Sequence, residues 1–296
     1  MAMTKVEAAK LTQDMMLRGV IETVITESMI LELLPFMEVI GTALTYNREA
    51  TLPAANFYDV GDTWTEATPT FTQVTAALKI LGGDADVDNF LQATYTDPND
   101  IEAEVIASRA KSLAYGYNQA FITGDSAVNA KSFDGIAKAV PAGQTVWVGT
   151  NGGPLTLDLM DEVIDRVKPG RPDALLMSKR SRRKLSALRR SAGNLLETDR
   201  TDFGRRALYY DGIPILVDEN QPDNEVRGSS GAVCSSIYPI KFGAEGVMGI
   251  ENGGIEIEEI GELETKDATR HRIKWYAGLA VFSELAVARL GGITAA

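Results

Sequence analysis

Two runs of the chain, Leu44–Leu52 and Val74–Ile80, alternate with a period of two residues, which is the pattern of extended strands. A segment rich in turn-forming residues separates the two runs. Antiparallel strands joined by a turn form a hairpin, so the pattern predicts one long β-hairpin with an irregular tip over residues 44–90.

This predicted hairpin has few large apolar side chains with which to build a core of its own. An isolated two-stranded ribbon is only marginally stable in water, and its exposed edges invite uncontrolled strand pairing. We therefore expect the ribbon to lie on another surface. A partner subunit would satisfy its strand edges and cover Trp64.

The clearest helix signal follows the hairpin. Asp97 is suited to cap a helix, Pro98 to occupy its first position, and acidic residues fill the first turn, where the helix dipole favours negative charge. Apolar residues then recur at three-and-four spacing from Ile106 to Phe121, and Gly124 supplies a stop. The pattern predicts a helix over 98–123, a rod of roughly 38 Å at ~1.5 Å per residue.

The other segments mix helical and extended patterns, which indicates an α+β protein. Pro35 is expected to end the helices predicted near the N-terminus. Further helices are predicted over 155–167 and 178–190, and strands over 174–177, 213–217 and 270–281.

Composition excludes several classes of protein. The chain of 296 residues is long enough for about two domains. It has no uncharged apolar run of the ~18 residues that a membrane helix needs, and the charges spread through its first residues lead us to expect no secretory signal. Its single cysteine, Cys234, cannot form an internal disulfide, and we expect synthesis and assembly in the cytoplasm. The net charge of −12 argues against an overall field that attracts nucleic acid.

A search for catalytic or cofactor motifs gives no candidate. The only histidine, His271, lies in a predicted strand, where we expect it to be partly exposed, and no phosphate-binding loop is present. Asp84, Asp86 and Asp88 faintly suggest calcium, but the glycine and glutamate of a calcium-binding loop are missing, so solvation at the surface is favoured. We predict no catalytic residue, no metal site and no cofactor.

Two sets of residues are candidates for binding partners. The first lies on the hairpin and is predicted to contact a neighbouring subunit: Arg48, Glu49, Trp64, Glu66 and Lys79. The second lies on the predicted basic helix and is suited either to phosphates of DNA or to carboxylates of a neighbouring copy: Arg180, Arg182, Arg183 and Lys184. A solvated basic face is the ordinary alternative for this helix.

The order of these elements resembles a known family. An N-terminal arm, a long hairpin, a long helix, a mixed α/β unit and a return to extended strands follow one another as in tailed-bacteriophage major capsid proteins of the Hong Kong 97 type. Local segments are similar too: Gly61-Asp62-Thr63-Trp64-Thr65-Glu66, Phe133-Asp134-Gly135-Ile136, Pro172-Asp173-Ala174-Leu175-Leu176-Met177, Gly278-Leu279-Ala280-Val281 and Ala286-Val287-Ala288-Arg289-Leu290.

The resemblance implies a division of the chain into four parts. These are an N-terminal arm over 1–43, an extended loop over 44–92, a peripheral domain of 93–134 and 232–296 built on the spine helix 98–123, and an axial domain over 135–231.

The resemblance also implies a role. Many copies would form the pentamers and hexamers of an icosahedral shell in the virion, assembled in the host cytoplasm. The shell would enclose double-stranded DNA without reading its sequence, and portal, scaffolding or decoration proteins are possible partners. No membrane is involved.

Two other functions stay open. An encapsulin nanocompartment would use the same fold to enclose cargo enzymes. A soluble carboxylate-dependent hydrolase could use a pair such as Asp161 and Glu162, although neighbouring residues on a helix do not face each other.

Overall fold

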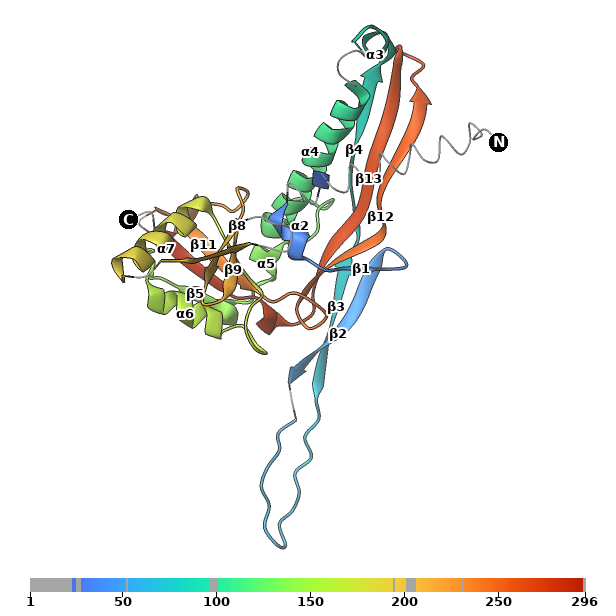
Figure 1. Cartoon of the computed structure of the whole chain (residues 1–296). Coiled ribbons are helices and arrows are strands. Elements are labelled where there is room, and N and C mark those ends of the chain that lie inside the picture. The colour runs from blue at the N-terminus through green and yellow to red at the C-terminus, as the bar shows by residue number, and fades with distance from the viewer. Residues whose placement is uncertain are drawn as a thin grey trace.

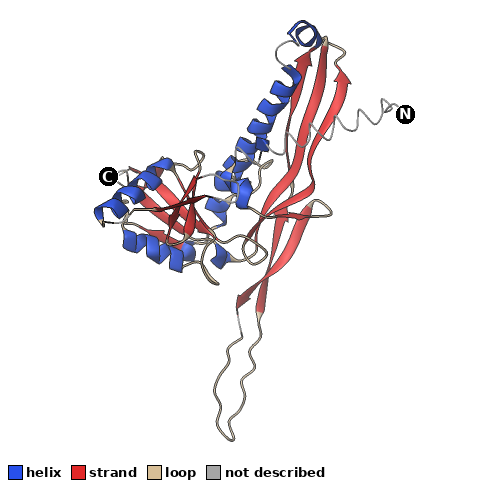
Figure 2. Cartoon of the chain, in the orientation of Figure 1, coloured by secondary structure: helices blue, strands red, loops and turns tan. Residues whose placement is uncertain are grey.

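The computed structural model describes residues 23–24, 28–51, 53–95, 101–193, 195–200, 206–229 and 231–294. The helical pattern predicted before residue 23 and the helix start at Asp97 and Pro98 lie outside these residues. The molecule has three visible parts: a long sheet with a helix along it, a second unit that contains the remaining helices and a sheet, and a hairpin that projects far from both (Figures 1 and 2).

The long sheet has four strands in the order β1-β12-β13-β4. Helix α4 contacts β4 and β13, and a short helix, α3, lies at the far end of the sheet (Figure 1). The bounds of these elements are β1 Phe36–Glu38, β4 Lys79–Asp88, α3 Asn89–Tyr95, α4 Ile101–Thr123, β12 Val247–Glu262 and β13 Ala268–Val281.

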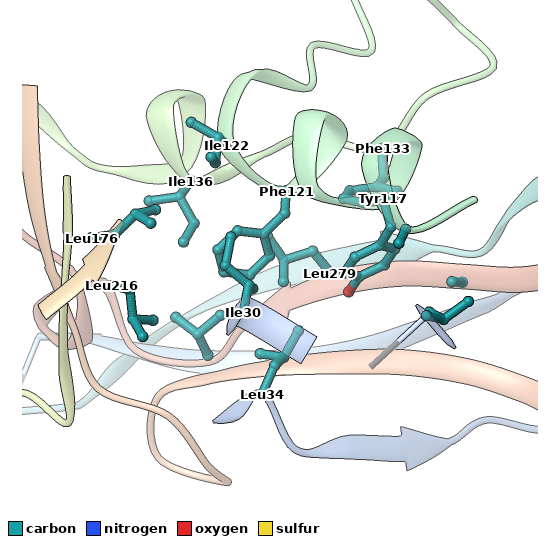
Figure 3. Close-up of a cluster of buried hydrophobic side chains, with 14 of the residues drawn as sticks. Ile30, Leu34, Tyr117, Phe121, Ile122, Phe133, Ile136, Leu176, Leu216 and Leu279 are labelled. Carbon is teal, nitrogen blue, oxygen red and sulfur yellow. The ribbon is translucent and has the colours of Figure 1, made fainter. Parts of the chain in front are cut away.

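The predicted long helix is confirmed by α4, and so is the face that it buries. All five of the predicted apolar positions are buried: Ile106, Ala110, Leu113, Tyr117 and Phe121. The ring of Tyr117 lies 4.8 Å from that of Trp275 on β13 and 5.8 Å from that of Phe36 on β1. Figure 3 shows Tyr117 and Phe121 pointing from the helix into the cluster between helix and sheet.

The end of α4 depends on two glycines. A Cβ on Gly124 would lie 2.4 Å from the carbonyl oxygens of Ala120 and Phe133, and one on Gly135 would lie 2.5 Å from the Ala120 oxygen. No real side chain tolerates such contacts, so only glycine lets the returning chain pass this close to the helix. The segment 125–133 therefore forms a loop fixed against the end of α4.

The second unit is built on an eight-stranded sheet in the order β5-β14-β11-β6-β9-β8-β7, with β10 paired to β11. The segments predicted as strands over 174–177 and 213–217 are its strands β6 and β9. Its elements are α5 Ile136–Ala139, β5 Thr145–Trp147, α6 Leu157–Asp165, β6 Ala174–Met177, α7 Lys179–Ser191, β7 Glu197–Arg200, β8 Arg206–Tyr210, β9 Ile213–Val217, β10 Glu225–Arg227, β11 Ala232–Ile240 and β14 Arg289–Thr294, with 3₁₀ turns at Ala142–Gln144 and Glu284–Ala286.

Two helices of this unit, α6 and α7, start at capped positions. The side chains of Thr156 and Ser178 accept hydrogen bonds from backbone N–H groups in the first turns of α6 and α7. Near the N-terminus, α2 (Met29–Leu33) ends just before Pro35, as the sequence predicts. No helix in the described ranges is long and apolar enough to cross a membrane.

The projecting hairpin consists of β2 (Ala43–Thr51) and β3 (Thr70–Ala77), paired antiparallel. The predicted hairpin is therefore confirmed, but it ends earlier than the predicted 44–90. From Lys79 to Asp88 the chain instead pairs with β13 over ten residues. Pairing of ten residues along an otherwise free edge of the long sheet stabilises this segment more than continued pairing in a two-stranded ribbon would.

One expectation about a polar residue on the long sheet is wrong. His271 is buried rather than partly exposed, because α4 covers its face of the central strand β13, and its Nε2 atom lies 3.2 Å from an oxygen of Glu102. Asp84 and Asp86 lie at the surface, as expected for the favoured interpretation, and also form ion pairs. Asp84 accepts from Arg272 and Asp86 from Arg270, across the β4–β13 pair, at 2.7 and 2.6 Å.

The burial of Phe121 gives a first prediction. We expect Phe121→Ala to lower the free energy of unfolding by about 3–5 kcal/mol, because it leaves a cavity between α4 and the sheet. Tyr115→Ala, on the exposed face of the same helix, is the matched control and should change it by less than about 0.5 kcal/mol. Urea unfolding monitored by circular dichroism measures both, and equal losses would contradict this account of the core.

The aspartate–arginine pairs give a second prediction. The hydrogen bonds from Arg272 and Arg270 lower the pKa values of Asp84 and Asp86 from their ordinary value. Each pair therefore stabilises the fold above the unfolded-state carboxyl pKa, near ~4, and this stability is lost as pH falls through the lower folded-state pKa.

We expect Asp84→Asn/Asp86→Asn to lower the melting temperature at pH 7 but to reduce its further fall on acidification below pH ~4. Thermal melts at several pH values measure the difference. Parallel curves for the variant and the wild type would show that these carboxyls contribute nothing to the acid sensitivity.

Candidate assembly interface

The base of the hairpin is tied to the body of the same molecule. The hydroxyl of Tyr46 donates to the carbonyl oxygen of Val281 at 2.7 Å, and its ring lies 4.9 Å from that of Phe282. Arg48 donates to the Phe282 carbonyl at 3.1 Å and to Glu284 at 2.9 Å, and also to the Val281 carbonyl. The ribbon therefore leaves the body in a fixed direction.

The tip of the hairpin, residues 53–69, is exposed throughout except for the half-buried Tyr58. It is nevertheless ordered by its own contacts. The rings of Tyr58 and Trp64 stack at 4.4 Å, and the Tyr58 hydroxyl accepts a hydrogen bond from the Thr65 backbone N–H at 3.0 Å. The Asp62 carboxylate accepts from the Asp59 backbone N–H at 2.7 Å, which holds the turn.

The tip also carries apolar side chains that nothing in the described part of the chain covers. Phe57 and Val60 are fully exposed, and Trp64 is 78% exposed. Phe71, on the adjoining strand β3, is 65% exposed. A ribbon that presents large apolar groups in this way, with unpaired strand edges, has the character of a surface that binds another protein.

The predicted hairpin residues separate into two groups. Arg48 and Lys79 bind their own chain, since the Lys79 ammonium donates to the Ala130 carbonyl at 2.8 Å. Glu49 is exposed on the ribbon opposite Phe71, and Trp64 and Glu66 lie on the exposed tip. Only these three are free in the described chain to contact a neighbour.

Sequence reasoning missed four members of this surface: Phe57, Tyr58, Val60 and Phe71. A signal was present. Apolar residues inside a turn-rich segment have no core position to occupy, so they are candidates for contacts with another molecule.

The basic helix α7 is one continuous surface element. Arg183 is exposed, while Arg182 and Lys184 are half-buried. Arg180 is held by its own unit, because it donates to the Ser235 hydroxyl at 3.0 Å and lies 3.5 Å from an oxygen of Asp223. The structure therefore brings three of the four predicted basic residues to positions where a phosphate or a carboxylate could reach them.

The two carboxylates considered for hydrolysis make separate interactions. Asp161 accepts a hydrogen bond from the Tyr210 hydroxyl at 2.7 Å, whereas Glu162 pairs with Arg166 at 3.1 Å. Burial raises the pKa of Tyr210, so this hydroxyl stays protonated as a donor. No group of three potential metal-binding side chains occurs in the ranges that the structure describes.

The arrangement of sheet, long helix, second unit and projecting hairpin matches that of solved shell proteins. The SrpI encapsulin of Synechococcus elongatus PCC 7942 is similar with a TM-score of 0.71 at 18% identity, covering 90% of this chain and 87% of that one. The capsid of an empty GTA particle matches with a TM-score of 0.67 at 16% identity, covering 90% of each chain. Microbacterium phage Oxtober96 matches with a TM-score of 0.65 at 16% identity, again covering 90% of each.

These similarities define the class of protein: the chain has the Hong Kong 97-type capsid fold, as the sequence predicts. The model of the phage capsid family matches residues 10–291. The chain therefore belongs to the phage capsid family. No curated protein sequence matches it.

The contacts at the base of the hairpin give a third prediction. Arg48→Ala removes the bonds to Phe282 and Glu284, so we expect amide hydrogen exchange in β2 and β3 to speed up by at least about fivefold. Gln73→Ala, an exposed change on the same ribbon, is the control. Exchange in α4 should not change in either variant. An unchanged exchange rate in β2 and β3 of Arg48→Ala would contradict the role of these contacts in fixing the base of the hairpin.

Proposed function

We propose that this protein is the major capsid protein of a tailed bacteriophage, which assembles through pentamers and hexamers into an icosahedral head around double-stranded DNA. The observation that carries the proposal is the hairpin tip 53–69, which presents Phe57, Val60 and Trp64 to solvent. Membership of the phage capsid family supports it. A tip with exposed apolar groups and no core of its own is suited to pack on another copy.

In this proposal the chain encloses DNA and does not read its sequence. The net charge of −12 disfavours strong binding of phosphates by the shell as a whole. Weak binding would let DNA enter the shell during packaging and leave it on release. Arg182, Arg183 and Lys184 on α7 are the candidates for local contact, either with DNA or with a neighbouring subunit. Portal, scaffolding or decoration proteins would be further partners, in a virion assembled in the host cytoplasm.

We further propose that the protein has no enzymatic role. The family is structural, and the candidate acid–base pair is divided between two unrelated interactions, with Tyr210 and with Arg166.

An encapsulin-type compartment is the second candidate. The observation that favours it is the similarity to the SrpI encapsulin, with a TM-score of 0.71. The two functions differ in what the shell encloses, a genome in one case and a cargo protein in the other.

Electron microscopy of the purified protein is the direct test, and gives the fourth prediction. We expect the wild-type protein to form closed particles of uniform diameter. At the same protein concentration, Trp64→Ala should give mostly smaller species. Loss of a buried aromatic anchor costs about 2 kcal/mol per contact, and the contacts are repeated around a shell. A monomer that stays monomeric under all assembly conditions would contradict the proposal.

The contents of particles isolated from infected or lysogenic cells separate the two candidates. A phage head should yield nuclease-protected double-stranded DNA, whereas a compartment should yield a single co-purifying enzyme and no protected genome. Protein cargo without DNA would favour the encapsulin reading.

A further inference from the structure

A small cavity of about 150 Å³ lies between the basic helix α7 and the end of strand β14 in the second unit. Figure 1 shows α7 on the side of this unit that faces away from the long sheet. The cavity is smaller than the roughly 300–1,000 Å³ of sites that take drug-sized ligands, so it suits a group of only a few atoms. Its lining includes Arg180, Ser181, Arg183, Lys184, Ala187 and Thr294.

The cations of the cavity project from one face of α7. Arg180, Arg183 and Lys184 are three and four residues apart, which places them side by side on a helix. Ala187 is the next residue of the same face, and its short side chain leaves space beside them. Like charges at this spacing repel each other on a helix. An anion in the cavity would remove that repulsion.

The described chain leaves most of this positive charge without a counterion. Among the described residues, Asp223 is the only carboxylate within ion-pair distance of any of the three cations, at 3.5 Å from the Nε atom of Arg180. Lys179, which does not line the cavity, pairs with Glu219. No described aspartate or glutamate lines the cavity itself. Arg183 and Lys184 are therefore available to a ligand.

Two of the lining residues are held in place by their own unit. The Nε atom of Arg180 donates to the Ser235 hydroxyl at 3.0 Å, and that hydroxyl donates to the Asp223 carboxylate at 2.5 Å. Ser181 is only 1% exposed, and among the described residues its hydroxyl accepts from Ser178 at 3.4 Å but donates to no group. A buried hydroxyl with a free hydrogen is suited to donate to an anion. Fixed donors also reduce the entropy lost on binding.

This set of donors favours phosphate over a carboxylate. Guanidinium groups donate paired hydrogen bonds to phosphate oxygens, and a lysine ammonium adds a compact charge. The oxygens of a tetrahedral phosphate point in several directions, whereas the two oxygens of a carboxylate lie in one plane. Three cations and the hydroxyls of Ser181 and Thr294 line the cavity, so a phosphate group can accept from several of them at once.

We propose that the cavity between α7 and β14 is a phosphate-binding site, in which Arg180, Arg183 and Lys184 neutralise the anion and Ser181 donates to one of its oxygens. The inference rests on the proposed capsid function for the source of the phosphate, which is the backbone of the enclosed double-stranded DNA. One such contact is weak, but a shell repeats it in every subunit. The shell therefore holds DNA at discrete points, although the chain as a whole is acidic.

Titration of the purified, unassembled protein with inorganic phosphate at constant ionic strength tests the site. We expect Arg183→Gln and Lys184→Gln each to weaken phosphate binding by at least about fivefold, because each removes a charge-assisted contact. Arg182→Gln is the matched control on the same helix. Arg182 does not line the cavity, so its loss should change the affinity by less than about twofold. Amide chemical shifts of α7, followed by NMR, give the affinities.

A variant that supplies its own anion tests the same site without loss of a cation. Ala187→Glu places a carboxylate one turn away from Arg183 on the face that lines the cavity. We expect this variant to melt at the wild-type temperature or above it, and to lose phosphate binding by at least about tenfold. A folded Ala187→Glu protein that binds phosphate as the wild type does would overturn the site.

Two further ligands identify the source of the anion. Acetate should compete at least about tenfold more weakly than phosphate, and equal competition would assign the cavity to a carboxylate of a neighbouring copy and overturn the proposal. A short DNA duplex should bind with the same order of affinities among the variants. Phosphate binding without duplex binding would overturn DNA as the source. DNA-filled particles in which electron microscopy places α7 on the outer surface would do the same.

The outcomes separate this inference from the proposed function. Closed shells that protect DNA from nuclease, built from a protein that binds no phosphate, would overturn the site and leave the capsid function intact. Failure of the wild-type protein to form any shell would contradict the capsid function and, with it, enclosed DNA as the source of the phosphate.

Discussion

The structure depends on the packing of one helix against one sheet. Tyr117 packs against both Trp275 on β13 and Phe36 on β1, whose rings also contact each other, and Phe121 continues the same face towards the second unit (Figure 3). Because these rings bury large apolar areas at fixed geometry, α4 has one position along the sheet. That position determines where the helix ends, where the loop 125–133 turns, and where β4 joins the long sheet beside β13.

The direction of the hairpin follows from this packing. β4 pairs with β13 over ten residues, and the ribbon is the continuation of that strand beyond the edge of the body. Tyr46 and Arg48 then fasten the other arm to the end of β13. A ribbon that is stable only because its base is attached can present its far end to another molecule. The same attachment that gives it direction leaves the exposed apolar side chains of the tip without a covering partner among the described residues of its own chain.

Polar residues on the long sheet show how one strand can serve two faces. On one face of β13, His271 is buried next to Glu102 under α4. On the other face, Arg270 and Arg272 pair with Asp86 and Asp84 of β4 at the surface. Successive side chains of a strand point to opposite sides, so a single alternating segment supplies both a covered pair and an exposed ladder of charges.

The sequence alone determined the local elements and the order in which they occur. The spacing from Ile106 to Phe121 specified α4 and its buried face, and alternation specified the ribbon, because both periods follow directly from backbone geometry. With the resemblance of this order to capsid proteins, that was enough for the fold. Only the tertiary structure decided that the ribbon ends at Ala77, that His271 is buried, and that Arg48 and Lys79 bind their own chain. Each of these depends on which distant segment lies alongside, and local periodicity holds no information about that.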